Sequence, residues 1–170
     1  MSMEARLADI TTLPVDAIVN AANENLMPGE GVSGAIHEAA GPELLEACRR
    51  IGHCPPGWAV ITSAFALPAR FVVHAVGPRW QGGNHDEREL LALAYKHALE
   101  VAHNNRCESV ALPAIGAGLA GFPVNEAAVI AVTVVRDALE REGFLEEVIF
   151  ACNTEAELDA FHEAMGVVPS

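Results

Sequence analysis

The sequence predicts an α/β fold in which a largely parallel sheet is covered by helices on both faces. Short apolar segments rich in β-branched residues alternate along the chain with longer segments of helical periodicity. Most of the short segments are apolar at nearly every position, which is typical of strands buried on both faces. Strands separated by helices favour parallel pairing. The length of 170 residues suits one such domain, and we expect residues 1–170 to form it.

Five segments are predicted to be strands, and a sixth, shorter strand is expected before Asp9. The five segments are residues 15–20, 58–62, 71–76, 110–112 and 148–152. Two helices, Val32–Ala40 and Pro42–Ile51, are predicted on either side of Gly41. Glycine interrupts the first of them, and proline suits the first position of the second.

Three further helices are predicted in the second half of the chain. One has an apolar stripe formed by Leu90, Ala94, Ala98 and Val101. The next has the equivalent stripe Ala128, Val132, Val135 and Leu139, and Gly143 is its expected C-terminal stop. The capping-box pattern of residues 154–157 predicts the start of the last helix, whose inward side chains are Leu158, Phe161 and Met165.

Charge and composition exclude several classes of protein. Hydrophobic residues make up 51% of the chain and charged residues 19%, which excludes a disordered chain. The net charge of −13 excludes broad nucleic-acid binding through a basic face. A small anionic ligand stays open, because backbone amides at a helix start bind phosphate. The apolar runs are shorter than the roughly 20 residues of a membrane span, and the first residues are polar, so we expect a cytoplasmic protein that binds no membrane.

The cysteines and histidines predict neither a disulfide framework nor a metal centre. Cys48, Cys54, Cys107 and Cys152 form no CxxC pair and are expected to be buried and reduced. The seven histidines show neither HxxxH nor HExxH spacing. His74 lies within an apolar strand and is expected to be a core histidine.

Two loops match the pattern G-x-G-x-x-G, at residues 29–34 and 116–121. Each follows a predicted strand and precedes a helix, so both should lie at the carboxyl ends of parallel strands, where open α/β folds bind ligands. Glycines let the backbone turn several N–H groups toward a phosphate, which favours a phosphate site. The alternative is a pair of tight turns with close helix–strand packing.

The better-known versions of this pattern do not fit. No Gly-Lys-Ser/Thr follows either loop, which excludes a P-loop, and eight residues separate Asn20 from Gly29, which excludes a Rossmann fingerprint. The asparagines of this intervening segment suit ribose hydroxyls, because an amide offers both donors and an acceptor. They equally suit a turn, and the residues alone leave both uses open.

Taken together, these segments resemble the macrodomain family, which binds ADP-ribose, and its MacroD-like bacterial branch most closely. The matching segments follow the family's order and are residues 8–11, 15–23, 31–37, 73–78 and 112–123. The resemblance implies a three-layer α/β/α sandwich on a mixed, mostly parallel sheet of about six strands.

The resemblance also implies a role for individual residues. Asp9 would accept a hydrogen bond from the adenine amino group, assisted by the Ile10 amide, and Asn23 would hold the distal ribose, against which Phe122 would pack. The two glycine loops would enclose the pyrophosphate. Asn153 stands where the family often stacks an aromatic ring on adenine, so stacking should be weaker here. The implied ligand-binding residues are Asp9, Ile10, Asn20, Ala22, Asn23, Gly31, Val32, Ser33, Gly34, Gly116, Ala117, Gly118, Leu119, Ala120, Gly121, Phe122 and Asn153.

The expected activity is the hydrolysis of an ADP-ribosyl ester, either O-acetyl-ADP-ribose or ADP-ribose on a protein carboxylate, without metal or cofactor. Asn23 and His37 are the candidate catalytic residues, although His37 equally suits helix packing. The family's aspartate position falls on Ser33, and an unactivated serine is a poor base. Glu30 is therefore a candidate replacement. The alternatives are a non-catalytic reader of ADP-ribosylated proteins and an unrelated nucleoside-diphosphate enzyme.

The remaining aromatic, glycine-rich and acidic positions are expected to have structural roles and not to bind a ligand. Trp80 is expected to anchor a loop and not to serve as a ligand platform, and residues 81–84 are expected to form a flexible turn. The acidic residues of the helices are expected to be solvated; they are Glu87, Glu89, Glu140, Glu142, Glu146 and Glu147.

Overall fold

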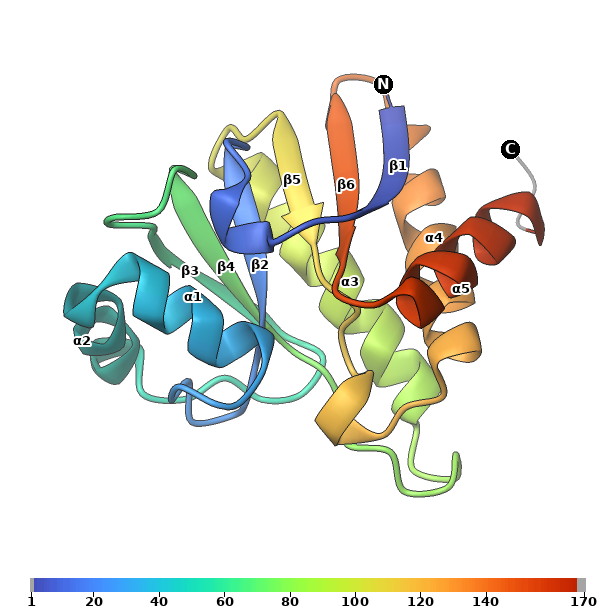
Figure 1. Ribbon diagram of the computed structural model, residues 1–170, viewed down its shortest axis with the longest axis horizontal. Helices are drawn as coiled ribbons and strands as arrows, with labels where there is room; N and C mark the ends of the chain where they lie inside the picture. The colour runs from blue at the N-terminus through green and yellow to red at the C-terminus, as the bar shows by residue number, and fades with distance from the viewer. Residues whose placement is uncertain (1, 168–170) are drawn as a thin grey trace.

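A six-stranded sheet forms the centre of the computed structural model, which describes residues 2–167 apart from the side chains of Leu119 and Val167 (Figure 1). In spatial order its strands are β1 (Ser2–Leu7), β6 (Glu147–Cys152), β5 (Ser109–Leu112), β2 (Ala17–Ala22), β4 (Phe71–Val76) and β3 (Ala59–Ser63). All neighbours pair in parallel except β3, which is antiparallel to β4. The predicted mixed, mostly parallel sheet is confirmed.

Helices cover the two faces of the sheet and complete three layers (Figure 1). One face carries α1 (Val32–Ala40) and α2 (Pro42–Ile51), whose bounds are those predicted. The opposite face carries α3 (Glu87–Asn104), α4 (Val124–Leu139) and α5 (Glu155–Val167). Two short 3-10 helices, η1 (Ile10–Thr12) and η2 (Gly118–Ala120), lie in the loops.

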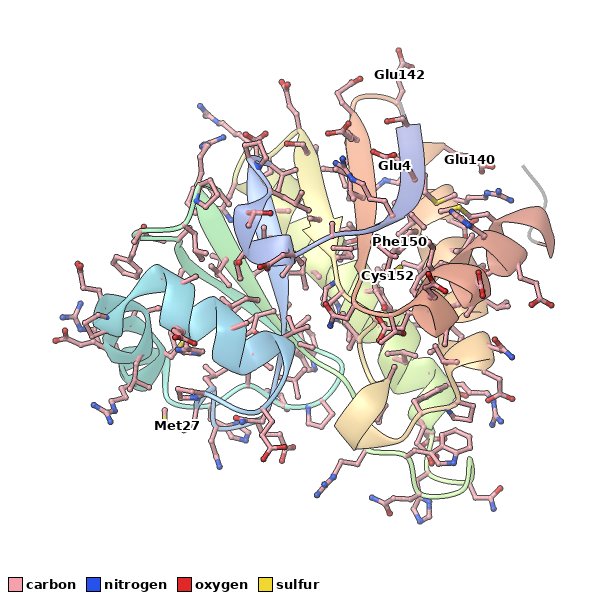
Figure 2. The ribbon with its side chains drawn as sticks, in the orientation of Figure 1. Glu4, Met27, Glu140, Glu142, Phe150 and Cys152 are labelled. Carbon is pink, nitrogen blue, oxygen red and sulfur yellow. The ribbon has the colours of Figure 1, made fainter. Side chains whose placement is uncertain are left out.

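The four central strands, β2, β4, β5 and β6, contribute side chains to two hydrophobic cores, because successive side chains alternate between the faces. In β6, Val148 and Phe150 belong to the core under α3, α4 and α5, whereas Ile149 and Ala151 belong to the core under α1 and α2. Figure 2 labels Phe150, whose ring centroid lies 4.6 Å from that of Phe161 in α5. Strands β2, β4, β5 and β6 are buried on both faces, as their apolar sequences predict, whereas the edge strand β1 is mostly exposed and the edge strand β3 is half-buried.

Three details of the helices differ from the predictions. Helix α4 ends at Leu139 with Glu140 as its C-cap, so Gly143 does not cap it; Gly143 instead takes a left-handed φ of 71° in the following turn. The buried face of α3 is centred one residue further along than predicted, on Leu91, Ala94, Tyr95 and Ala98. The predicted cap of α5 forms, because the Glu157 N–H donates to Thr154 Oγ1 over 3.1 Å, but the Glu157 carboxylate accepts from Asn153 and not from Thr154.

The four cysteines are buried and unpaired, as predicted. Within residues 2–167, no helix combines the length and the apolar character that crossing a bilayer requires. Of the acidic residues expected to be solvated, Glu140 and Glu142 are exposed and lie away from the loops that follow the parallel strands (Figure 2).

Candidate functional site

A cleft opens where the parallel strands β2, β4, β5 and β6 end and their following loops meet, at the lower edge of the sheet in Figure 1. It consists of a larger hollow of about 910 Å³ and a smaller one of about 620 Å³. Gly31, Val32 and Asn153 line both hollows, so the two adjoin. The carboxyl edge of a parallel sheet is where the topology predicts a ligand site.

The first glycine loop forms one wall of the larger hollow. Gly31 is the N-cap of α1 and takes a left-handed φ of 66°, and it lines the larger hollow together with Val32 and Ser33, the first residues of the helix. The first N–H groups of any helix lack partners within it and carry a partial positive charge, so this wall suits an anion. Gly34 does not line the cleft; a Cβ there would lie 2.5 Å from the Gly29 carbonyl oxygen. Close backbone packing therefore explains the last glycine of the pattern.

The second glycine loop lines the larger hollow as well, through Gly116, Ala117, Gly118 and Ala120. Gly116 and Gly118 both take left-handed φ angles, of 83° and 71°, and a side chain at Gly118 would meet open space. Leu119 belongs to η2, but its side chain lies outside the described part of the chain. The two glycine loops thus meet in one cleft, as predicted.

Two predicted members of this loop region do not line the cleft. Gly121 is the C-cap of η2, and Phe122 is only 3% exposed. The Phe122 ring packs on the Trp80 ring, with 4.8 Å between centroids, and the backbone N–H of Trp80 donates to the Ala120 carbonyl over 2.9 Å. Trp80 is thus the predicted loop anchor, and Phe122 supports the second glycine loop from behind.

Asn23 lines the larger hollow and also closes its own turn. Its Nδ2 donates to the Met27 carbonyl over 3.0 Å, and its Oδ1 accepts from the Met27 N–H over 3.1 Å; Met27 is labelled in Figure 2. An amide keeps a second N–H and a second lone pair beyond these bonds. The turn interpretation is confirmed, and binding capacity is left over for a ligand beside Ala22, which also lines this hollow.

Asn20 lies elsewhere than predicted. It is 1% exposed and does not line the cleft; its Nδ2 lies 3.1 Å from His74 Nδ1 on the neighbouring strand. His74 is the predicted core histidine, with its Nε2 3.0 Å from Thr62 Oγ1 and 3.8 Å from Cys48 Sγ. Burial, and then the nearby His37, lower the pKa of His74 to about 3.

His37 likewise lies behind the cleft and not in it. It is 8% exposed, and burial lowers its pKa. Neither ring nitrogen has a hydrogen-bond partner within residues 2–167, and its ring centroid lies 6.5 Å from that of His74. The structure therefore places His37 where the packing interpretation expects it. Ser33, one turn earlier, does line the larger hollow, and its Oγ accepts from the Gly29 N–H over 3.4 Å.

The smaller hollow is lined by Asp9, Ile10 and Asn153, as the resemblance implies. Asp9 caps η1, and its Oδ1 accepts from both the N–H and the hydroxyl of Thr11, over 3.0 and 2.6 Å. These two bonds fix the orientation of the carboxylate. Asp9 Oδ2 takes part in neither of them and is available to a donor in the hollow.

The loop after β4 supplies lining residues that the sequence analysis missed, among them Arg79 and Gln81. Glu87 holds this loop: its carboxylate accepts from the N–H groups of Gln81, Gly83 and His85 over 2.8, 2.9 and 2.6 Å. Glu87 is 1% exposed; its burial opposes ionisation, but the backbone hydrogen bonds prevail and lower its pKa to about 2.

The prediction of a solvated Glu87 is therefore wrong, because its carboxylate is buried. A turn does lie at residues 81–84, and two of its N–H groups, those of Gln81 and Gly83, donate to this carboxylate. The pair Gly82-Gly83 just before an acid at a helix start is the sequence signal that could have revealed it.

Acidic side chains outnumber cations along the cleft. Among the described residues that line the two hollows, the single cation is Arg79, and the acids are Asp9, Glu24, Glu30 and Glu157. An anionic ligand would therefore be held mainly by backbone N–H groups of the glycine loops and by the start of α1.

A family model, curated relatives and solved structures all match most of this chain. The family model described as Macro domain matches residues 19–131. A Macro domain-containing protein of Chlorobaculum tepidum is 54% identical over 158 residues, covering 93% of this chain and 92% of its own length. A Citrobacter rodentium protein named O-acetyl-ADP-ribose deacetylase is 54% identical over 151 residues, covering 86% and 85%. The Oceanobacillus iheyensis macrodomain solved with ADP superimposes with a TM-score of 0.91 at 38% identity, covering 95% and 88%.

Proposed function

Because this chain belongs to the Macro domain family, we propose that it binds ADP-ribose in the cleft and hydrolyses ADP-ribosyl esters, O-acetyl-ADP-ribose in particular. The observation that carries the proposal is the meeting of two glycine loops across one cleft, with a second hollow adjoining them. A relative that is 54% identical is named for the deacetylation of O-acetyl-ADP-ribose, which supports the choice of substrate.

The proposed ligand extends from the smaller hollow into the larger. Adenine occupies the smaller hollow, where Asp9 Oδ2 accepts from its exocyclic amino group and the Ile10 N–H donates to the ring. The diphosphate lies between the start of α1 and the loop at residues 116–120. The distal ribose lies beside Asn23 and the backbone of Ala22. Asn20 and Phe122 have no part in this arrangement, because neither lines the cleft.

The proposed reaction is attack by water on the ester carbonyl carbon. The bond between this carbon and the ribose oxygen breaks, the ribose oxygen takes a proton, and the products are a carboxylate and ADP-ribose. Asn23 orients the distal ribose for this step. His37 is not part of the proposal, since this buried residue of α1 lines neither hollow.

The base that activates the water is the open part of the mechanism. Ser33 carries no carboxylate, whereas Glu30 lies exposed on the same wall of the larger hollow. A phosphate oxygen of the ligand is the alternative base and would make turnover slow. Ser33 thus also favours a second candidate function, that of a reader that binds ADP-ribose on other proteins without cleaving it.

Incubation with O-acetyl-ADP-ribose and with ADP-ribosylated protein, followed by measurement of free ADP-ribose, tests the proposal. Release from either substrate supports hydrolysis, and calorimetric binding without release at high protein concentration leaves only the reader. Ser33→Asp should raise the rate at least about tenfold, because a positioned base contributes roughly 10²–10⁴-fold. Ser33→Asn is the matched control without a carboxylate.

The role of Glu30 is tested separately. Glu30→Gln should lower turnover with little loss of ADP-ribose affinity if its carboxylate activates the water. Glu38→Gln makes the same charge change at an exposed position of α1 outside the cleft. Equal turnover in the two variants would eliminate Glu30 as the base.

A further inference from the structure

Glu157 is an acidic residue of the cleft wall to which the proposed reaction assigns no role. It lies in the first turn of α5 and lines the larger hollow, beside Asn153, which lines both hollows. Asn153 therefore lies at the junction between the hollows, and Glu157 lies on the larger hollow next to that junction, bonded to Asn153.

The Glu157 carboxylate is held in place by the cap of its own helix. Its Oε1 accepts from the Asn153 N–H over 3.0 Å, while its own N–H donates to Thr154 Oγ1 over 3.1 Å. Within residues 2–167, Oε2 has no hydrogen bond or ion pair. The carboxylate thus has a fixed position and an acceptor oxygen to spare.

The charge of Glu157 acts at this end of β6 without a compensating cation. Burial, and then the Glu157 charge, raise the pKa of Cys152 to about 12. Among the described residues no cation forms an ion pair with Glu157, and Arg79, the single cation that lines the hollows, belongs to the loop after β4. A second negative group near Glu157 would therefore be repelled.

We propose that Glu157 makes the cleft select a ligand whose adenosine ribose has free hydroxyls, and makes it reject the 2′-phosphorylated form. The inference rests on the proposed function, since an ADP-ribose with adenine in the smaller hollow and diphosphate between the loops has its adenosine ribose at the junction. There the free Oε2 accepts from ribose hydroxyls, and the carboxylate repels a phosphate on the same ring. A carboxylate on a ribose 2′-hydroxyl discriminates in this way in dinucleotide-binding proteins.

Calorimetric titration with ADP-ribose and with 2′-phosphorylated ADP-ribose tests this selection. The wild-type protein should prefer ADP-ribose at least about tenfold. Glu157→Gln should reduce this preference at least about fivefold, by weakening ADP-ribose and strengthening the phosphorylated ligand. The variant should still fold, because the glutamine Oε1 can accept from the Asn153 N–H; thermal unfolding checks this.

Glu155→Gln is the matched control, with the same change of charge at an exposed residue of the same turn that does not line the cleft. It should leave the preference unchanged. If Glu157→Gln leaves the preference unchanged, the inference is overturned while the proposed function stands. The same holds if the variant binds both ligands more tightly by an equal factor, because that result would place Glu157 against the diphosphate. Failure of the wild-type protein to bind ADP-ribose overturns both.

Discussion

Replacing Gly34 by alanine should separate the first glycine loop from α1. The added Cβ would lie 2.5 Å from the Gly29 carbonyl oxygen, which is a backbone atom and cannot swing aside as a flexible side chain does. Ordinary contacts begin at 3.4 Å, so helix and loop must part by about 0.9 Å. Gly29 lines the larger hollow, and the displacement therefore reaches the ligand site.

Two opposing effects set the stability of this variant. Overpacking costs roughly 1–3 kcal/mol, while alanine gains about 1 kcal/mol of helix propensity over glycine. The free energy of unfolding should therefore fall by no more than about 2 kcal/mol. Affinity should fall as well, because the displaced loop loses hydrogen bonds to the charged diphosphate, each of which contributes roughly 1.5–3 kcal/mol, or about tenfold or more in affinity. We expect ADP-ribose to bind at least about tenfold more weakly.

Calorimetric titration and urea unfolding measure the two quantities on the same sample. Gly166→Ala is the control, since Gly166 lies in α5 and its added Cβ would have no neighbour within 4 Å. This change should stabilise the protein by about 0.4–1 kcal/mol and leave affinity unchanged. If Gly34→Ala binds ADP-ribose as tightly as the wild type does, the close approach of Gly29 has no part in shaping the site.

Three further predictions concern residues behind the cleft. Glu87→Gln should weaken ADP-ribose binding. The pKa of the Glu87 carboxyl is about 2 in the folded protein, below its usual 4.5, so the free energy of unfolding of the wild-type protein should fall as pH drops from 4.5 toward 2. Urea unfolding against pH measures this, and an equal acid slope in the variant would contradict it. His74 is neutral when folded, with its pKa lowered from 6.5 to about 3, so stability should also fall as pH drops through this interval, less steeply in His74→Gln. Phe122→Ala should cost roughly 3–5 kcal/mol of unfolding free energy, and a loss below 1 kcal/mol would show that its contact with Trp80 contributes little.

Local signals in the sequence predict much of the fold. Gly41 and Pro42 fix the boundary between α1 and α2, because their backbone restrictions act within one or two residues. The strands are found equally well, since burial on both faces leaves apolar runs. The predicted stop of α4 is wrong, because the helix already ends at Leu139, where the C-cap N–H of Glu140 donates to the Arg136 and Ala138 carbonyls, and Gly143 takes its left-handed φ four residues later.

The positions of Asn20 and Glu87 were not predicted for a different reason, which is that each side chain pairs with a group distant in the sequence or in a separate loop. Asn20 has the same amide chemistry in a ribose site as in a core, and only the register of β2 with β4 shows that its neighbour is His74, 54 residues away. Glu87 resembles the solvated acids of its helix until the loop at residues 81–85 directs three N–H groups at it. Sequence patterns report residue type and spacing, but not which distant group completes a hydrogen bond.

The position of β1 has a consequence for the order in which the protein assembles during synthesis. Within the described sheet β1 pairs with β6 alone, with Leu7 opposite Cys152, so the strand that precedes the other five in the chain must wait for the one that follows them. Strands β2, β4 and β3 with α1 and α2 lie within residues 17–76 and can associate earlier. Asp9 and Asn153 follow directly on β1 and β6, and the hollow that they line is therefore completed last. A nascent chain halted before residue 147 would hold the first glycine loop but would lack Cys152 and Asn153, which line the smaller hollow.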